Sequence, residues 1–150
     1  QRDGVPYDLI SKSLPTVEGA VNDILAQIVD FSVVFSMNGK DIDTHIVYDD
    51  DRVWSLELSS GMERFISSLA IRIGLMNVSN LPQGNFLAID EGWGTMDSEN
   101  LNSVSQLFQY LKTQFQFTFV VSHIETMRDF VDTLLEIKKV DGSSSVRFIR

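Results

Sequence analysis

The spacing of hydrophobic and polar positions changes several times along the chain. Apolar residues recur every three or four positions over residues 1–30, alternate with polar residues from position 31, and return to helical spacing after position 61. Two short apolar runs follow, at 86–89 (F-L-A-I) and at 117–121 (F-T-F-V-V). Runs of this length are typical of strands buried on both faces, as in the parallel sheet of an α/β protein. The pattern predicts an α/β fold with a mostly parallel sheet, flanking helices and a small β-rich part.

The first 30 residues contain no recognisable chemistry. Residues 1–30 are predicted to be helical, with Pro15 interrupting one helix and starting a second. Residues 31–57 are predicted to form a β-hairpin or a small meander, because an alternating segment is followed by the turn signal Asn38-Gly39.

A long amphipathic helix is predicted to begin after Ser59 or Ser60. Either serine is a suitable N-cap, and Glu63 lies three residues after Ser60, as in a capping box. The capping role explains a serine here, but the small residues Ser59, Ser60 and Gly61 also leave the first-turn N–H groups open to an anion. The start of this helix is therefore a candidate phosphate site.

The remaining elements are predicted from similar signals. Ser98 is a suitable N-cap for a helix that reaches about Thr113. A short helix is expected over residues 125–131, and residues 133–137 and 145–149 are expected to form a closing hairpin.

Polar side chains follow each of the two apolar runs. Asp90 and Glu91 come at the end of the first run, and His123 follows the second. Ligands of open α/β sheets bind at the carboxyl ends of the strands. Two adjacent acids repel each other and need a cation or a proton, which a nucleotide-bound Mg²⁺ would supply, with Asp90 in the metal shell and Glu91 facing an attacking water. Taken alone, the pair is equally compatible with a solvated acidic turn.

Composition and charge narrow the possible classes of protein. The chain has no cysteine, which excludes disulfides and thiolate metal sites, and no apolar run of about 20 residues that would span a membrane. The net charge is −9, and residues 1–57 hold eleven acidic and four basic residues. A basic stripe typical of nucleic-acid-binding surfaces is missing from the sequence. Any contact with DNA is therefore expected to be local or to involve other parts of the molecule.

Four segments, in order, resemble the motifs of ABC-type ATPases. Residues 58–63 (L-S-S-G-M-E) resemble the signature motif, residues 86–91 (F-L-A-I-D-E) the Walker B strand, residues 94–97 the D-loop, and Ser122-His123 the switch histidine region. Within this superfamily, D-E-G-W-G-T-M-D is similar to the D-E-G-F-G-T-L-D of SbcC-type enzymes, which are SMC-like ATPases that partner a nuclease in double-strand-break processing. The order and spacing of the segments agree with the family along nearly the whole chain.

The resemblance implies a role for each candidate site residue. Asp90 would hold the Mg²⁺ shell, Glu91 would polarise the attacking water, and His123 would contact the γ-phosphate of ATP. Asp97 would couple the two sites of a head dimer, and the signature residues Ser59, Ser60 and Gly61 would face the nucleotide bound to the opposite head. The implied partners are a second head, a nuclease subunit and DNA, in an intracellular compartment.

The phosphate-binding loop of the family is missing. No G-x-x-x-x-G-K-[ST] motif occurs in the sequence, so this chain cannot bind ATP by itself in the family's manner. In SMC-like proteins the two ends of one polypeptide, joined through a coiled coil, build the head. We therefore expect residues 1–150 to be the C-terminal lobe of a split head, with 1–30 returning from the coiled coil and 58–150 carrying the motifs. The alternatives are an SMC-type chromosome-organising ATPase and a non-catalytic scaffold lobe.

Overall fold

The computed structural model describes residues 4–49, 51–80, 82, 84–90 and 100–149. The predicted α/β class is confirmed, and no helix in this part of the chain is long and apolar enough to cross a membrane. The elements are, in order, α1 (Gly4–Leu25), β1 (Phe31–Asn38), β2 (Asp41–Tyr48), β3 (Val53–Ser55), the 3-10 helix η1 (Leu56–Leu58), α2 (Gly61–Val78), β4 (Phe86–Asp90), α3 (Leu101–Gln114), β5 (Phe117–Val121), the 3-10 helix η2 (Glu125–Phe130), β6 (Leu135–Val140) and β7 (Ser143–Phe148).

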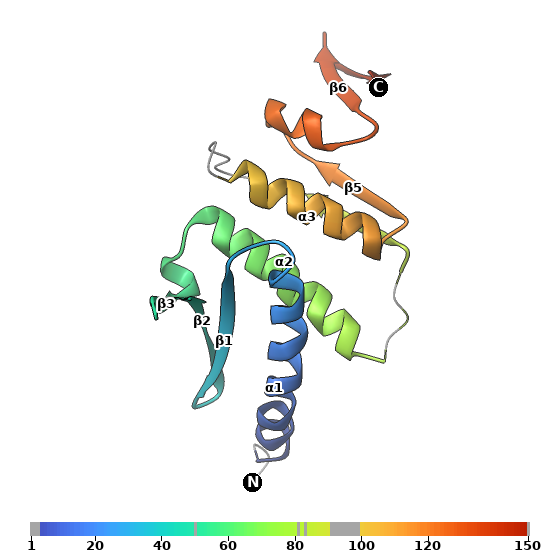
Figure 1. Cartoon of the computed structure of the whole chain (residues 1–150). Coiled ribbons are helices and arrows are strands. Elements are labelled where there is room, and N and C mark those ends of the chain that lie inside the picture. Colours follow the sequence, from blue (N-terminus) through green and yellow to red (C-terminus); the bar gives the residue numbers. More distant parts are fainter. Residues whose placement is uncertain (1–3, 50, 81, 83, 91–99, 150) are drawn as a thin grey trace.

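The described strands form three separate sheets. β1, β2 and β3 form an antiparallel meander, β4 and β5 a parallel pair, and β6 and β7 an antiparallel hairpin. Figure 1 shows the meander beside α1 and α2, and α3 between α2 and β5. Within the described residues, the predicted parallel sheet is thus limited to β4 and β5, and of the two forms predicted for residues 31–57, a hairpin or a small meander, the structure has the meander.

The prediction of two helices separated by Pro15 was wrong. α1 is a single helix of 22 residues that contains Pro15. A proline inside a helix removes the hydrogen bond to the carbonyl four residues earlier and often kinks the helix without ending it. Residues after Pro15 pack against the rest of the core, with Val21, Ile24 and Leu25 all buried, and this burial offsets the local cost.

Two hairpin turns connect the antiparallel strands. Gly39 has a φ of +63° in the turn between β1 and β2, where the sequence predicted a turn. The closing hairpin turns at Asp141 (φ +48°) and Gly142 (φ +80°), because Asp-Gly suits a two-residue turn with two positive φ angles. β6 therefore extends to Val140, three residues beyond the predicted end of the strand.

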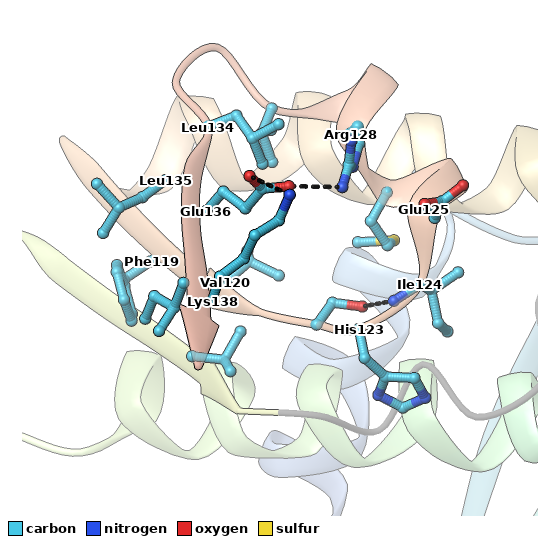
Figure 2. Close-up of a pocket in the computed structure, with 15 residues that line it drawn as sticks. Phe119, Val120, His123, Ile124, Glu125, Arg128, Leu134, Leu135, Glu136 and Lys138 are labelled. Atoms are coloured by element: carbon cyan, nitrogen blue, oxygen red, sulfur yellow. Dashed lines mark hydrogen bonds and ion pairs between the residues drawn. The ribbon is translucent and has the colours of Figure 1, made fainter. Parts of the chain in front are cut away.

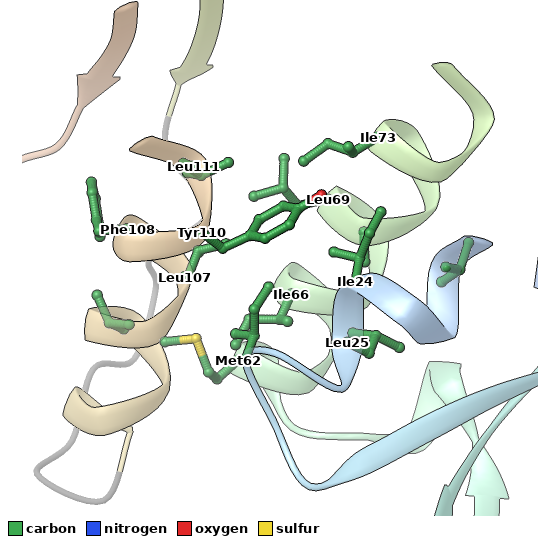
Figure 3. Packing of buried hydrophobic residues seen from close by; sticks show 14 of the residues in the cluster. Ile24, Leu25, Met62, Ile66, Leu69, Ile73, Leu107, Phe108, Tyr110 and Leu111 are labelled. Atoms are coloured by element: carbon green, nitrogen blue, oxygen red, sulfur yellow. The ribbon is translucent and has the colours of Figure 1, made fainter. Parts of the chain in front are cut away.

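The core joins α1, α2 and α3. Met62, Ile66, Leu69 and Ile73 form the buried face of α2, as its helical spacing predicted. Figure 3 shows these side chains meeting those of α3 on one side and of α1 on the other. α3 begins at Leu101 with Asn100 as its N-cap, slightly later than the predicted start after Ser98, which lies outside the described residues.

Candidate functional site

The carboxyl ends of β4 and β5 lie at one edge of their sheet. Asp90, the last residue of β4, pairs with Val121, the last residue of β5, and His123 follows two residues later. The parallel register thus brings Asp90 and His123 to the same edge, as the sequence predicted. Both residues are exposed, so they are accessible to a ligand.

The turn after β5 is fixed by a local hydrogen bond. The backbone N–H of Ile124 donates to Oγ of Ser122 at 3.1 Å, and η2 begins at Glu125. Figure 2 shows the imidazole of His123 projecting away from the ion pairs that surround Glu136. The short helix predicted at residues 125–131 is therefore present as a 3-10 helix, and the turn before it presents His123 outward.

Several predicted site residues fall outside the described part of the chain. They are Glu91 and Asp97, along with the rest of the 91–99 segment. Asp90 is the described member of the acidic pair, and its carboxylate oxygens suit a hard cation such as Mg²⁺. Among the described residues, no group of three or more acids or histidines is placed to hold a metal ion. A complete magnesium site therefore needs further ligands beside Asp90.

The other candidate residues start α2. The predicted capping box is present: Oγ of Ser60 accepts from the backbone N–H of Glu63 at 3.2 Å, and the Glu63 carboxylate accepts from the backbone N–H of Ser60 at 2.7 Å. Ser59 is buried, and its Oγ donates to the carbonyl of Leu56 at 2.5 Å. Ser59, Ser60 and Gly61 thus belong to the start of α2, whereas Asp90 and His123 stand at the ends of β4 and β5.

A contact that the sequence did not predict holds the capping box. Oη of Tyr48, at the end of β2, donates to the Glu63 carboxylate at 2.6 Å. The pKa of Tyr48 is raised mainly by burial of its hydroxyl, and to a smaller extent by this hydrogen bond and by the negative charge of Glu63. The two residues are 15 positions apart, and only the fold of the meander against α2 joins them, so no local signal could have revealed the pair.

A pocket of about 420 Å³ lies between β5 and β6 (Figure 2). One wall comes from residues 119–123 of β5 and the following turn, and the other from residues 134–138 around β6. These strands belong to different sheets, so the facing edges of β5 and β6 are not paired with each other. A second pocket, of about 270 Å³, borders the beginning of β5. Among the described strands, β5 is therefore paired only with β4.

An ion-pair cluster lies on the pocket side of β6. The carboxylate of Glu136 pairs with Arg128 at 3.4 Å, Lys138 at 3.3 Å and Arg147 at 3.0 Å. Desolvation opposes ionisation of Glu136, but the hydrogen bonds and charges of Lys138 and Arg147 outweigh it and lower the pKa of its carboxyl group. The cluster joins η2 to both strands of the closing hairpin.

One face of the β4–β5 sheet is apolar and exposed. Phe86 and Phe117 are directly paired, their rings stack with centroids 5.7 Å apart, and they remain 55% and 58% exposed. Phe119 and Val121 continue the same face. The prediction that both runs are buried on both faces is thus wrong for this chain, because α3 covers only the side of Leu87, Ile89 and Val120.

Curated proteins with similar sequences include SbcC. The chain is 34% identical to an uncharacterized protein of Acanthamoeba polyphaga mimivirus over 96% of its length. It is 30% identical to the SbcC component of the SbcCD nuclease of Staphylococcus aureus over 79% of its length. The chain spans 12% of the length of each of these relatives. No protein-family model matches the chain.

Solved structures with the same fold include SMC proteins and their head domains. One comes from work on ATP-driven dimerization and DNA-stimulated activation of SMC ATPases, with a TM-score of 0.75 and 16% identity over 95% of this chain and 89% of that one. The head domain of the Smc protein from Pyrococcus yayanosii matches with a TM-score of 0.68 and 18% identity, over 96% of this chain and 28% of that one.

The fold and the sequence similarities lead to one class. The chain is the C-terminal lobe of an SMC-like ATPase head. Within that class its sequence is homologous to a segment of SbcC, the protein whose motif the D-E-G-W-G-T-M-D stretch resembles.

Proposed function

We propose that this chain is one half of an ATP-hydrolysing head of an SbcC-like protein that acts in DNA repair or recombination. The head would dimerise on binding ATP and would regulate a partner nuclease on DNA, inside the cell. The proposal rests on an incomplete site: Asp90 and His123 stand at the carboxyl ends of β4 and β5, and a pocket lies along β5 where a further strand would pair.

The open edge and the exposed face support completion by a second lobe. A β-strand placed in the pocket between β5 and β6 would find backbone partners on both sides, since neighbouring strands lie about 4.8 Å apart. A helix following that strand would cover Phe86, Phe117 and Phe119, which together form an exposed apolar surface. A strand followed by a helix is also the unit that carries a phosphate-binding loop, which this sequence lacks.

In the completed head each residue would act by position and charge. Asp90 would hold the shell of a Mg²⁺ ion, which would neutralise charge on the phosphates. Glu91 would orient the attacking water, and His123 would donate a hydrogen bond to the γ-phosphate. Asp97 would contact the second head. Ser59, Ser60 and Gly61, at the positive end of the α2 dipole, would face the nucleotide of that second head.

A glutamine at position 91 tests the assignment of the water-orienting residue. In a protein that contains both lobes, Glu91→Gln should keep ATP-driven dimerisation and reduce turnover by a factor of about 100 or more, the order expected for a general base. Dimerisation is followed by light scattering and turnover by phosphate release. Unchanged turnover in Glu91→Gln would rule out this role.

Two further experiments separate the alternatives. Absence of ATP hydrolysis above background when both lobes are present would favour the non-catalytic scaffold. Co-purification of a nuclease with the native protein would favour the SbcC-like function over an SMC-type chromosome-organising ATPase.

A further inference from the structure

The start of α2 is anchored from outside by the meander. Tyr48 is packed between Phe31 and Trp54, with ring centroids 5.5 Å and 5.1 Å away, and the guanidinium carbon of Arg52 lies 5.1 Å from the centre of its ring. Three neighbours therefore fix the direction of the phenol. Its hydroxyl donates at 2.6 Å to Glu63, a contact of the short, charge-assisted kind.

Both oxygens of the Glu63 carboxylate are engaged. Oε1 accepts from Tyr48, and Oε2 accepts from the backbone N–H of Ser60 at 2.7 Å. The carboxylate thus stands at the N-terminus of α2, where the first-turn N–H groups of Gly61 and Met62 have no acceptor within the helix. These N–H groups are where a phosphate from a second head would bind in the proposed function.

A negative charge at this position competes with a phosphate. If the Glu63 carboxylate lost its hydrogen bond from Tyr48, it could turn toward the N–H groups of Gly61 and Met62 and occupy them in place of a phosphate. In any orientation that brings the carboxylate closer to the phosphate, the two negative charges would also repel each other. The hydrogen bond from Tyr48 opposes both effects, because it holds the carboxylate in the capping position and disperses part of its charge.

We propose that Tyr48 is a positioning residue for the signature segment (residues 58–63): through Glu63 it keeps the start of α2 preformed and accessible to the nucleotide phosphate of a second head. Tyr48 itself does not touch the nucleotide. The inference rests on the proposed function, and it adds the meander as the part of the lobe that sets the affinity of one head for the other.

The test uses the full-length native protein, which would contain both lobes, and measures the ATP concentration that gives half-maximal head dimerisation. Tyr48→Phe keeps the packed ring and removes the hydrogen bond, and it should raise that concentration about tenfold, as expected for a lost hydrogen bond to a charged group. Tyr110→Phe is the matched control, since it removes the hydroxyl of a buried tyrosine that reaches from α3 toward α2 (Figure 3), whereas the Glu63 oxygens are held by Tyr48 and Ser60, and it should leave the concentration unchanged.

The double variant separates positioning from simple destabilisation. Glutamine can still accept from the Ser60 N–H in a capping box but has no charge. Glu63→Gln alone should therefore dimerise at the wild-type ATP concentration or below it, and Tyr48→Phe/Glu63→Gln should return to within about twofold of wild type. A purely structural role would instead make the double variant at least as defective as Tyr48→Phe.

The outcomes are distinct. Wild-type midpoints in Tyr48→Phe, or failure of Glu63→Gln to rescue it, would overturn the positioning role while leaving the proposed function intact. A wild-type protein that does not dimerise at any ATP concentration would overturn the proposed function and this inference together.

Discussion

A Cβ atom at Gly74 would lie 2.8 Å from Cγ2 of Val21 and 3.3 Å from its backbone nitrogen. Gly74 faces α1 from the second half of α2, and Val21 is completely buried. A glycine inside a helix costs stability relative to alanine. Its presence here allows α1 and α2 to approach closely enough to exclude a methyl group.

Gly74→Ala should lower the free energy of unfolding by about 1–3 kcal/mol, because the clash exceeds the gain in helix propensity. Gly19→Ala is the matched control on α1, where no atom lies within 4 Å of the added Cβ. It should raise the free energy of unfolding by about 0.5–1 kcal/mol. Urea unfolding followed by circular dichroism measures both, and a stabilised Gly74→Ala would contradict the close approach.

Ser67 is completely buried on α2, and its Oγ has no hydrogen-bond partner in the described part of the chain. A buried hydroxyl without a partner costs stability. Ser67→Ala should therefore raise the free energy of unfolding by about 1 kcal/mol. Ser68→Ala, at the neighbouring exposed position, should change it by less than about 0.5 kcal/mol. A loss of stability in Ser67→Ala would show that the hydroxyl has a partner.

Asn22 on α1 makes two hydrogen bonds to the backbone of Val33 on β1. Its Nδ2 donates to the carbonyl at 2.9 Å, and its Oδ1 accepts from the N–H at 2.8 Å. Asn22→Ala should lower the free energy of unfolding by about 1–3 kcal/mol, because it removes both partners of a buried strand residue. Gln27→Ala removes only an exposed local bond and serves as the control. Equal stability of the two variants would contradict the bridging role of Asn22.

Tyr48 should make stability depend on pH in the alkaline range. Burial, the hydrogen bond to Glu63 and the charges of Glu63 and Asp30 raise its pKa, against the opposing charge of Arg52. Because the folded pKa lies above the unfolded one, the contribution is fully present below the unfolded pKa of about 10 and is lost as pH rises further. Burial also raises the pKa of Tyr110.

The measurement is the free energy of unfolding from about pH 9 to about pH 12, a range that begins below the unfolded pKa of tyrosine. Tyr48→Phe should lose stability less steeply than wild type over this range, and Tyr110→Phe retains the contribution of Tyr48. Parallel curves for wild type and Tyr48→Phe would contradict the raised pKa.

Local patterns in the sequence were sufficient to predict most of the elements. Residues a few positions apart determine the capping box of Ser60 and Glu63 and the apolar face of α2. The parallel arrangement of β4 and β5 follows from the usual connection between parallel strands through a helix. The prediction that Pro15 separates two helices was wrong, because a single missing hydrogen bond does not end a helix whose later turns pack against the core.

The remaining differences come from long-range contacts. The hydrogen bond from Tyr48 to Glu63 depends on how β2 meets α2, which no spacing in the sequence encodes. The exposure of Phe86 and Phe117 reflects a sheet face that nothing in the described part of this chain covers. An apolar run reports that a strand can be buried, but the segment that buries it need not lie in the same sequence.

The proposed function places Asp90, Glu91 and His123 in one half of an ATPase site. The decisive measurement is ATP hydrolysis by this chain alone, by the N-terminal lobe of the native protein alone, and by the two lobes mixed. The mixture is also measured with Phe119→Asp in this chain, a variant that disturbs the exposed sheet face. Turnover is predicted only in the mixture, and Phe119→Asp should reduce it by weakening assembly of the lobes. Turnover by this chain alone, or the absence of turnover in an assembled complex, would contradict the proposed division of the site between two lobes.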